Sequence, residues 1–392
     1  MPLGLYVAVP FCRTKCTYCN FSSGVFSRSL FQRYVNRLCH DIEDARQTAG
    51  QTGALLPSDV DSIYFGGGTP TVLDCTDLER LFVTIRQNFC LNPKTEITVE
   101  CAPGTLSEPI IQALQRCGVD RISLGVQSFV DREAAAVGRL HKRETVLGDI
   151  ARLRAAGISN INIDLIAGLP HQTAASWQFS LNETIAAGVS HASVYMLEID
   201  DDSRLGRELI AGGKRYHAHF VPDEDLTADL YEIACEQLNT AGIRQYEISN
   251  FAQHGHESRH NLKYWTRQPY IGFGVDAHSM LPANVKEADS IRFATADSLE
   301  EFFAGKLLES APVSLQAARE ENFFLGLRLN CGVNLAAIGG PAEEYGSIIG
   351  ELVEAGLLEQ SGECIRLTSR GRLLSNEVFA RFIATPSSMP VP

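Results

Sequence analysis

Three cysteines lie close together near the start of the chain, in the segment VPFCRTKCTYCNF at residues 9–21. Cys12, Cys16 and Cys19 are separated by three and then two residues, and Phe21 stands two positions beyond the third. A structural zinc site takes four ligands, usually with a second cysteine or histidine pair farther along the chain, and no such pair follows. A 4Fe-4S cluster held by three thiolates leaves one iron with an open coordination site. We therefore expect a 4Fe-4S cluster on these cysteines, with zinc as the fallback.

Other polar or small residues stand where short apolar, β-branched segments end. Such segments begin at residues 5, 62, 96, 121, 160 and 192, and an amphipathic stretch follows each one. This alternation is typical of buried parallel strands with helices between them. It predicts an α/β fold, a partial (β/α)6 TIM-like barrel whose ligand sites lie at the carboxyl ends of the strands. After the cysteines, those ends carry GGGTP at 66–70, Glu100, Gln127 and Asp164.

Each of these positions also has a purely structural interpretation. GGGTP is typical of a tight turn, but after a strand beside the cysteine loop it favours close backbone approach to a ligand. A buried carboxylate at Glu100 is costly unless paired, so it is either a ligand-binding group or half of a structural salt bridge. The same alternatives hold for Gln127, Arg139 and Asp164, and Tyr6 is either a ligand contact or an ordinary core tyrosine.

The composition changes along the chain suggest four segments. Residues 1–210 carry the strand–helix alternation, and residues 211–311 are interpreted as a barrel extension with a loop region that contains HNLKYW. Residues 312–383 are expected to form a small C-terminal α-helical, winged-helix-like domain with a hairpin near Ser361 and Gly362. Residues 384–392 are expected to be a disordered tail.

The bulk composition narrows the class of protein. Hydrophobic residues make up 45% and charged residues 21% of the chain, and no apolar run reaches the length of a membrane span. The chain starts without a basic leader or a cleavage site, and its cysteine count of 11 is odd, so we expect a cytoplasmic protein with reduced thiols. The net charge of -13 argues against a nucleic-acid partner, because binding phosphates needs clustered Lys and Arg.

The cysteine spacing after the first strand resembles the radical S-adenosylmethionine (SAM) superfamily. The resemblance implies that SAM chelates the open iron, and that the reduced cluster can cleave SAM to a 5'-deoxyadenosyl radical. Within the superfamily the chain closely resembles the oxygen-independent coproporphyrinogen III oxidase family, through the segments YVAVPFCRTKCTYCNF, YFGGGTPT, ITVECAPGTL, ISLGVQSF, GRLH, DLIAGLP, YEISNFA and RHNLKYW. By its motifs the resemblance also implies a SAM pocket formed by Tyr6, Tyr18, Gly67, Gly68, Thr69, Glu100, Gln127, Arg139 and Asp164.

Departures from the decarboxylating members of this family favour its HemW branch, whose members look like haem chaperones. The decarboxylating members carry a fourth cysteine where Phe21 stands, and a long extension where only five residues precede Tyr6. HNLKYW, at residues 260–265, matches the HNxxYW signature of the HemW branch. The family often has a cysteine at the position of Ser258, so thiol-based haem attachment is excluded there.

The resemblance predicts a protein that binds haem and hands it to acceptor proteins. His260 is the candidate haem ligand, since imidazole is a common axial ligand to haem iron, and a satisfied structural histidine is the alternative. His254 and His256 offer other ligands nearby. The expected partners are haem, an unidentified acceptor that could be membrane-associated, an electron donor if SAM is cleaved, and a second copy in a homodimer.

Two enzymatic alternatives stay open. The first is an oxygen-independent coproporphyrinogen III oxidase, which decarboxylates coproporphyrinogen III to protoporphyrinogen IX through a 5'-deoxyadenosyl radical. The second is a related radical enzyme that acts on haem, such as a methylating ring opener. Vinyl-group formation in a turnover assay would favour the first alternative over the chaperone.

Overall fold

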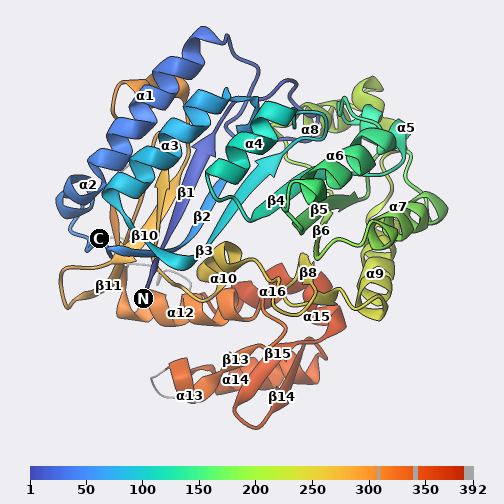
Figure 1. Ribbon diagram of the computed structural model, residues 1–392. Coiled ribbons are helices and arrows are strands. Elements are labelled where there is room, and N and C mark those ends of the chain that lie inside the picture. Colours follow the sequence, from blue (N-terminus) through green and yellow to red (C-terminus); the bar gives the residue numbers. More distant parts are fainter. Residues whose placement is uncertain (307–309, 339–342, 384–392) are drawn as a thin grey trace.

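A computed structural model describes residues 1–306, 310–338 and 343–383 (Figure 1). The tail expected at 384–392 lies outside the described residues. Within the described part, all 11 cysteines are free thiols, and no helix is long and apolar enough to cross a membrane.

Six parallel strands form the centre of a twelve-stranded sheet in the described residues and confirm the predicted partial barrel. In spatial order they are β1 (Leu3–Val9), β2 (Asp59–Gly67), β3 (Cys90–Cys101), β4 (Arg121–Gln127), β5 (Asn160–Ala167) and β6 (His191–Met196). β1 is buried at every position except Tyr6, as expected for a strand covered on both faces. The carboxyl ends of these strands therefore meet along one edge of the sheet.

Helices alternate with the strands and cover the outer face of the sheet (Figure 1). Their apolar stripes, such as Leu38 and Ile42 on the first and Leu81 on the third, are fully buried against the strands. Each aliphatic side chain buried in this way contributes about 1.5–3 kcal/mol. The helices are α1 (Ser29–Glu43), α2 (Ala45–Gln51), α3 (Cys75–Asn88), α4 (Glu108–Arg116), α5 (Asp131–Ala136), α6 (Arg143–Ala155) and α7 (Ala174–Ala186).

The region after residue 196 extends the sheet at both edges. After α8 (Arg204–Ile210) and α9 (Glu224–Thr240), β8 (Asn250–Ala252) pairs antiparallel with β6, and β7 (Arg244–Gln245) pairs antiparallel with β8. α10 (Arg259–Trp265) carries HNLKYW and leads to β9 (Tyr270–Phe273), which pairs parallel with β1. β10 (His278–Pro282), β11 (Ala288–Ala294) and β12 (Ala311–Ser314) continue from β9 as antiparallel strands. A region that looks loop-rich in sequence thus flanks β1 on its second side.

The C-terminal part forms a small unit of helices and a three-stranded sheet, drawn in orange and red in Figure 1. The expected hairpin is present as β14 (Leu358–Ser361) and β15 (Cys364–Leu367), with Gly362 at a φ of 58° in the turn. Phe323, Ile365 and Phe382 belong to the separate core of this unit. Its other elements are α12 (Leu315–Gly326), β13 (Val333–Asn334), α13 (Leu335–Ile338), α14 (Glu343–Glu354), α15 (Ser369–Leu373) and α16 (Ser375–Ala380), and α11 (Leu299–Phe303) precedes β12.

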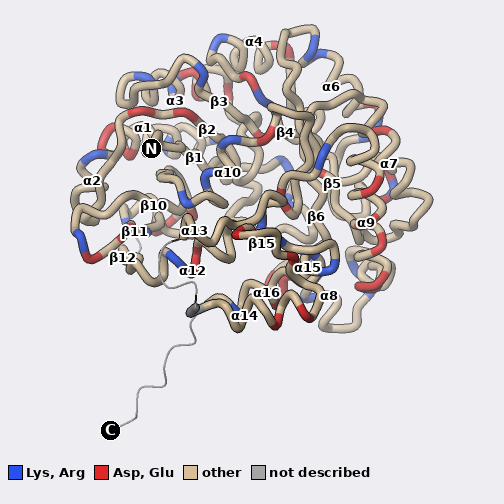
Figure 2. The backbone as a smooth tube through the Cα atoms, turned by 90° about the horizontal axis from the view of Figure 1, so that it is seen from below, with Lys and Arg blue, Asp and Glu red and all other residues tan. Residues whose placement is uncertain are grey.

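Charged residues of both signs are interspersed over the molecule in the view from below (Figure 2). The net charge of -13 therefore spreads over many elements in that view and is not confined to one segment. Charges interspersed in this way, with a net negative total, give little attraction for a polyanion.

Candidate functional site

The cysteine loop leaves β1 at the carboxyl edge of the sheet and folds back on itself. The Cys12 N–H donates to the Gly24 carbonyl at 2.8 Å, and the Gly24 N–H donates to the Pro10 carbonyl at 2.9 Å. Cys16 is buried, whereas Cys12 and Cys19 are half-buried. These two hydrogen bonds close the loop at its base. They hold the three cysteines against the barrel, where none of them is fully exposed to solvent.

The glycine segment after β2 lies directly under this loop. The N–H groups of Gly68 and Thr69 donate to the carbonyls of Val9 and Phe11, each at 2.8 Å. A Cβ on Gly68 would lie 2.8 Å from those same two carbonyl oxygens and 3.0 Å from the Cys12 sulfur. Gly67 has a φ of +98°, in the left-handed region that favours glycine. The sequence is therefore restricted to glycine here because the cysteine loop occupies the space of a side chain.

A second group of expected residues lies beside Cys16. The Arg139 guanidinium donates to the Cys16 sulfur at 3.5 Å and to the Gly125 carbonyl. A Cβ on Gly125 would lie 3.1 Å from the Arg139 Nη2 and 3.2 Å from the Gln127 Nε2, so the missing side chain makes room for both. Gln127 itself has a φ of 70° at the end of β4. Burial, followed by the charge on Cys16, raises the pKa of the neighbouring Tyr18.

A third group holds two carboxyl groups inside the barrel. The Tyr64 hydroxyl donates to Glu100 Oε1 at 2.8 Å, and Asp164 accepts from Ser123 at 3.0 Å. Burial, followed by the charge of Asp164, raises the pKa of Glu100 from 4.5 to about 7. Burial likewise raises the pKa of Asp164, and burial together with Glu100 raises that of Tyr6. The pair is thus an acidic site that would stabilise a cationic or hydroxyl-bearing ligand.

The raised pKa of Glu100 gives a stability prediction. Between pH 4.5 and about 7 the folded chain holds a proton on Glu100 that the unfolded chain has released, so this group's contribution declines as pH rises through that window. Glu100→Gln removes the cost of the buried charge. We expect it to raise the free energy of unfolding at pH 8 by about 2–3 kcal/mol, with little difference near pH 4.5. Urea denaturation at both pH values in the absence of SAM measures this.

The control is Glu43→Gln, at an exposed position near the end of α1. It should change the free energy of unfolding by less than about 0.5 kcal/mol at either pH. Equal effects of the two variants at pH 8 would contradict the buried-charge account of Glu100.

His260 lies apart from the cysteine loop, at the other end of β1. A Cβ on Gly4 would lie 3.3 Å from the His260 ring, and Gly4 precedes Val9 by roughly 17 Å of extended strand. Ser62 Oγ lies 3.1 Å from His260 Nδ1, and the Tyr264 hydroxyl lies 2.9 Å from Nε2. The ring is 1% exposed, and burial followed by the charge of Lys263 lowers its pKa to about 3. The geometry favours the structural alternative for His260, because both ring nitrogens already have partners.

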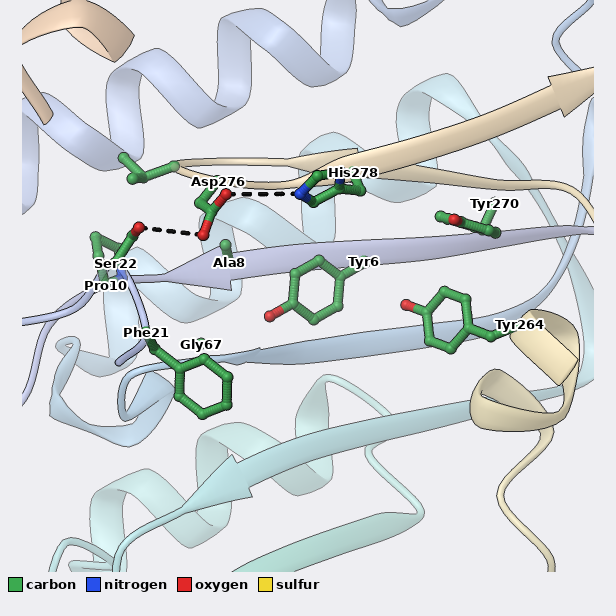
Figure 3. Close-up of a pocket in the computed structure, with 11 residues that line it drawn as sticks. Tyr6, Ala8, Pro10, Phe21, Ser22, Gly67, Tyr264, Tyr270, Asp276 and His278 are labelled. Carbon is green, nitrogen blue, oxygen red and sulfur yellow. Dashed lines mark hydrogen bonds and ion pairs between the residues drawn. The ribbon is translucent and has the colours of Figure 1, made fainter. Parts of the chain in front are cut away.

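A cavity of about 310 Å³ lies between the cysteine loop and the segment from β9 to β10 (Figure 3). Figure 3 shows the side chains of Tyr6, Tyr264 and Phe21 at this cavity, together with Ser22, Asp276 and His278. Its full lining is Tyr6, Ala8, Pro10, Phe21, Ser22, Gly67, Tyr264, Tyr270, Val275, Asp276 and His278. The cavity therefore combines aromatic walls with a few polar groups, as small-molecule sites do.

The structure brings together most of the residues expected at the site and adds others. Gly67, Gly68 and Thr69 contact the cysteine loop, Arg139 contacts Cys16, and Tyr6 and Gly67 line the cavity. Sequence reasoning missed Tyr64, Tyr270, Asp276 and His278, which lie in ordinary strands or turns. The sequence signal that could have pointed to Asp276 and His278 is their Asp-x-His spacing in FGVDAHS. His254 and His256 are not among the cavity residues.

The surroundings of the three cysteines are compatible with an iron-sulfur cluster. A cubane cluster places each thiolate on a different iron, so its thiolates stand farther apart than the ligands of one zinc. The glycine floor under Cys12 and the arginine beside Cys16 fit such an anionic group.

Comparisons with known proteins agree with this geometry. Residues 6–182 match the model of the radical SAM superfamily, and residues 313–374 match the HemN C-terminal domain. The haem chaperone HemW of Bacillus subtilis is 33% identical, over 96% of this chain and 98% of its own, and HemW of Escherichia coli is 29% identical over 98% of both. The solved coproporphyrinogen III oxidase (HemN) of E. coli shares the fold, with a TM-score of 0.82 over 97% of this chain and 90% of its own, at 23% identity.

Proposed function

This chain belongs to the HemW family of radical SAM proteins, and on that premise we propose that it is a haem chaperone. It binds haem and transfers the haem to acceptor proteins. The observation that carries the proposal is similarity to curated haem chaperones along nearly the whole chain, both barrel and C-terminal unit. Membership of the superfamily implies a 4Fe-4S cluster and SAM as cofactors.

In this proposal Cys12, Cys16 and Cys19 bind the cluster. When bound, the cluster and SAM supply one-electron chemistry at the edge of the barrel. The guanidinium of Arg139 offsets negative charge at Cys16, to which it already donates a hydrogen bond. Gly68 keeps the space beside Cys12 free of a side chain.

The SAM-binding residues are proposed on the same basis. Glu100 and Asp164 offer carboxylates to an ammonium or to ribose hydroxyls, and the raised pKa of Glu100 allows it to donate a hydrogen bond when protonated. Gly67 offers half-buried backbone at the cavity wall. The remaining members of the proposed pocket are Tyr6, Tyr18, Thr69, Gln127 and Arg139.

The proposal extends to partners and location. The aromatic cavity beside the cysteine loop gives a porphyrin an apolar surface close to the cofactors. Eleven free cysteines suit a reducing compartment, so a cytoplasmic location belongs to the proposal. The proposal also includes an unidentified acceptor protein, an electron donor for the case in which SAM is cleaved, and a homodimer.

An anaerobic haem titration of the cluster-reconstituted protein tests the function. We expect the Soret band to saturate near one haem per chain, and the bound haem to pass to an added apo-haem protein. A parallel assay with coproporphyrinogen III, SAM and a reductant should give no vinyl product. Catalytic decarboxylation without saturable haem binding would replace the chaperone with the oxidase alternative.

A further inference from the structure

The cavity beside the cysteine loop contains one histidine, His278, at the start of β10. Its imidazole side chain is 69% exposed, and its Nε2 lies 3.6 Å from Asp276 Oδ1. In the described part of the chain no other hydrogen bond or ion pair engages this ring. One ring nitrogen of His278 is therefore available to a ligand that enters the cavity.

The backbone before β10 places Asp276 and His278 together. Asp276 has a φ of 55°, a left-handed conformation that non-glycine residues adopt seldom and mostly at turns or functional sites. Gly274, two residues earlier, has a φ of +101°, and a Cβ there would lie 2.4 Å from the Tyr34 hydroxyl and 2.5 Å from the Ala8 carbonyl. This tight turn directs the carboxylate of Asp276 toward the ring of His278, as Figure 3 shows.

The same carboxylate links the histidine to the cysteine loop. Ser22 donates from its hydroxyl to Asp276 Oδ2 at 3.1 Å, while Asp276 Oδ1 faces His278. Ser22 follows Cys19 by three positions, so the chain of contacts in Figure 3 runs from the proposed cluster loop to the imidazole. Asp276 therefore contacts both the proposed cluster loop and the histidine.

His260 differs from His278 in each of these respects. Its ring is buried, both of its nitrogens have partners, and it does not line the cavity. Its neighbour on the helix, Tyr264, does line the cavity, and the hydroxyl of Tyr264 is the group that His260 Nε2 contacts. His260 is therefore suited to position Tyr264 in the cavity wall.

We propose that His278 is the axial ligand of the haem iron, that Asp276 orients its ring, and that His260 is a positioning residue for Tyr264. This rests on the proposed haem-binding function and names the site at which haem is held. A carboxylate that accepts from the far nitrogen of a metal-bound imidazole fixes the tautomer and raises the ligand's basicity. Tyr264 and Tyr270 supply ring surface for the macrocycle.

The size and openness of the site agree with a carrier. The cavity volume of about 310 Å³ is at the lower end for small-molecule sites, and Phe21 at its edge is 64% exposed. A porphyrin held by one edge in such a cavity keeps the rest of its surface accessible to an acceptor protein.

The test is an anaerobic haem titration of the full-length, cluster-reconstituted protein and of its His278→Ala, Asp276→Asn and His260→Ala variants. We expect His278→Ala to lose tight binding and to shift the Soret band, and we expect added imidazole to restore the original band. Asp276→Asn should weaken binding about tenfold while keeping the imidazole-ligated spectrum. His260→Ala should keep that spectrum, because the iron ligand is still present.

His40→Ala is the matched control, because His40 also faces a carboxylate, that of Asp44 at 3.2 Å, and is 68% exposed on α1 far along the chain from the cavity. It should bind haem like the parent protein. A parent-like titration of His278→Ala, or a loss of the band with imidazole rescue only in His260→Ala, overturns the assignment. Absence of saturable haem binding by the parent protein instead overturns the proposed function itself.

Discussion

Cys16→Ser is expected to abolish the iron-sulfur cluster. A serine hydroxyl is not deprotonated near neutral pH and does not replace a thiolate, so two thiolates would remain to hold the cluster. Cys16 is the buried member of the three and the one that Arg139 contacts, so solvent or another side chain cannot readily take its place. Iron and sulfide analysis after anaerobic reconstitution should fall from about four of each per chain to background, with loss of the brown chromophore.

Cys90→Ser is the control for this experiment. Cys90 is an exposed thiol at the start of β3, away from the carboxyl ends of the strands. It should retain the parent's iron and sulfide content. A full cluster in Cys16→Ser, or an equal loss in Cys90→Ser, would refute the assignment of the cysteines.

Gly68→Ala is expected to disrupt the site by steric crowding alone, because it removes no functional group. The added methyl would lie 2.8 Å from the carbonyl oxygens of Val9 and Phe11, closer than Cβ atoms approach in proteins, and 3.0 Å from the Cys12 sulfur, which is a tight contact. Two of these three atoms are backbone, so the cysteine loop itself must shift. We expect a cost of about 1–3 kcal/mol in the free energy of unfolding and at least a partial loss of reconstituted cluster.

Gly148→Ala provides the matched glycine control. Gly148 is exposed on α6, and a Cβ there would have no atom within 4 Å. Alanine is favoured over glycine inside a helix by about 0.5–1 kcal/mol, so this variant should be more stable than the parent and reconstitute normally. Denaturant unfolding together with iron analysis of both variants measures the contrast. If Gly68→Ala matched Gly148→Ala in both measurements, the close approach of the glycine segment to the cysteine loop would not be needed for stability or for cluster binding.

The parallel strands of the barrel could be predicted because most of their residues are covered on both faces of the sheet. Runs such as LGLYVAV at residues 3–9 are apolar at nearly every position, and covered parallel strands produce this pattern. The edges of the sheet could not be predicted in this way. β7 and β8 have two and three residues, too few for a recognisable period, and they are held by the pairing of β8 with β6 and of β7 with β8.

The two histidines of the site also differ in what the sequence could predict about them. HNLKYW draws attention to His260 in the sequence, but hydrogen bonds with Ser62, 198 positions away, and with Tyr264 occupy its ring. His278 lies in an ordinary strand and stands out only because the turn at Asp276 and the pairing of β9 with β1 place it in the cavity. Spacing along a chain cannot reveal which of two histidines is exposed, since exposure depends on distant residues that pack around it.

The sequence alone determined the groups with local signatures: the three cysteines on one loop, the glycine segment, and the polar residues at the ends of parallel strands. These follow from chain order, because consecutive parallel strands bring their carboxyl ends to one edge. The tertiary structure decided which of those groups touch. It placed Gly68 against Cys12, Arg139 against Cys16 and Asp276 against both Ser22 and His278. These contacts join residues up to 254 positions apart, and only the packing of the folded chain specifies them.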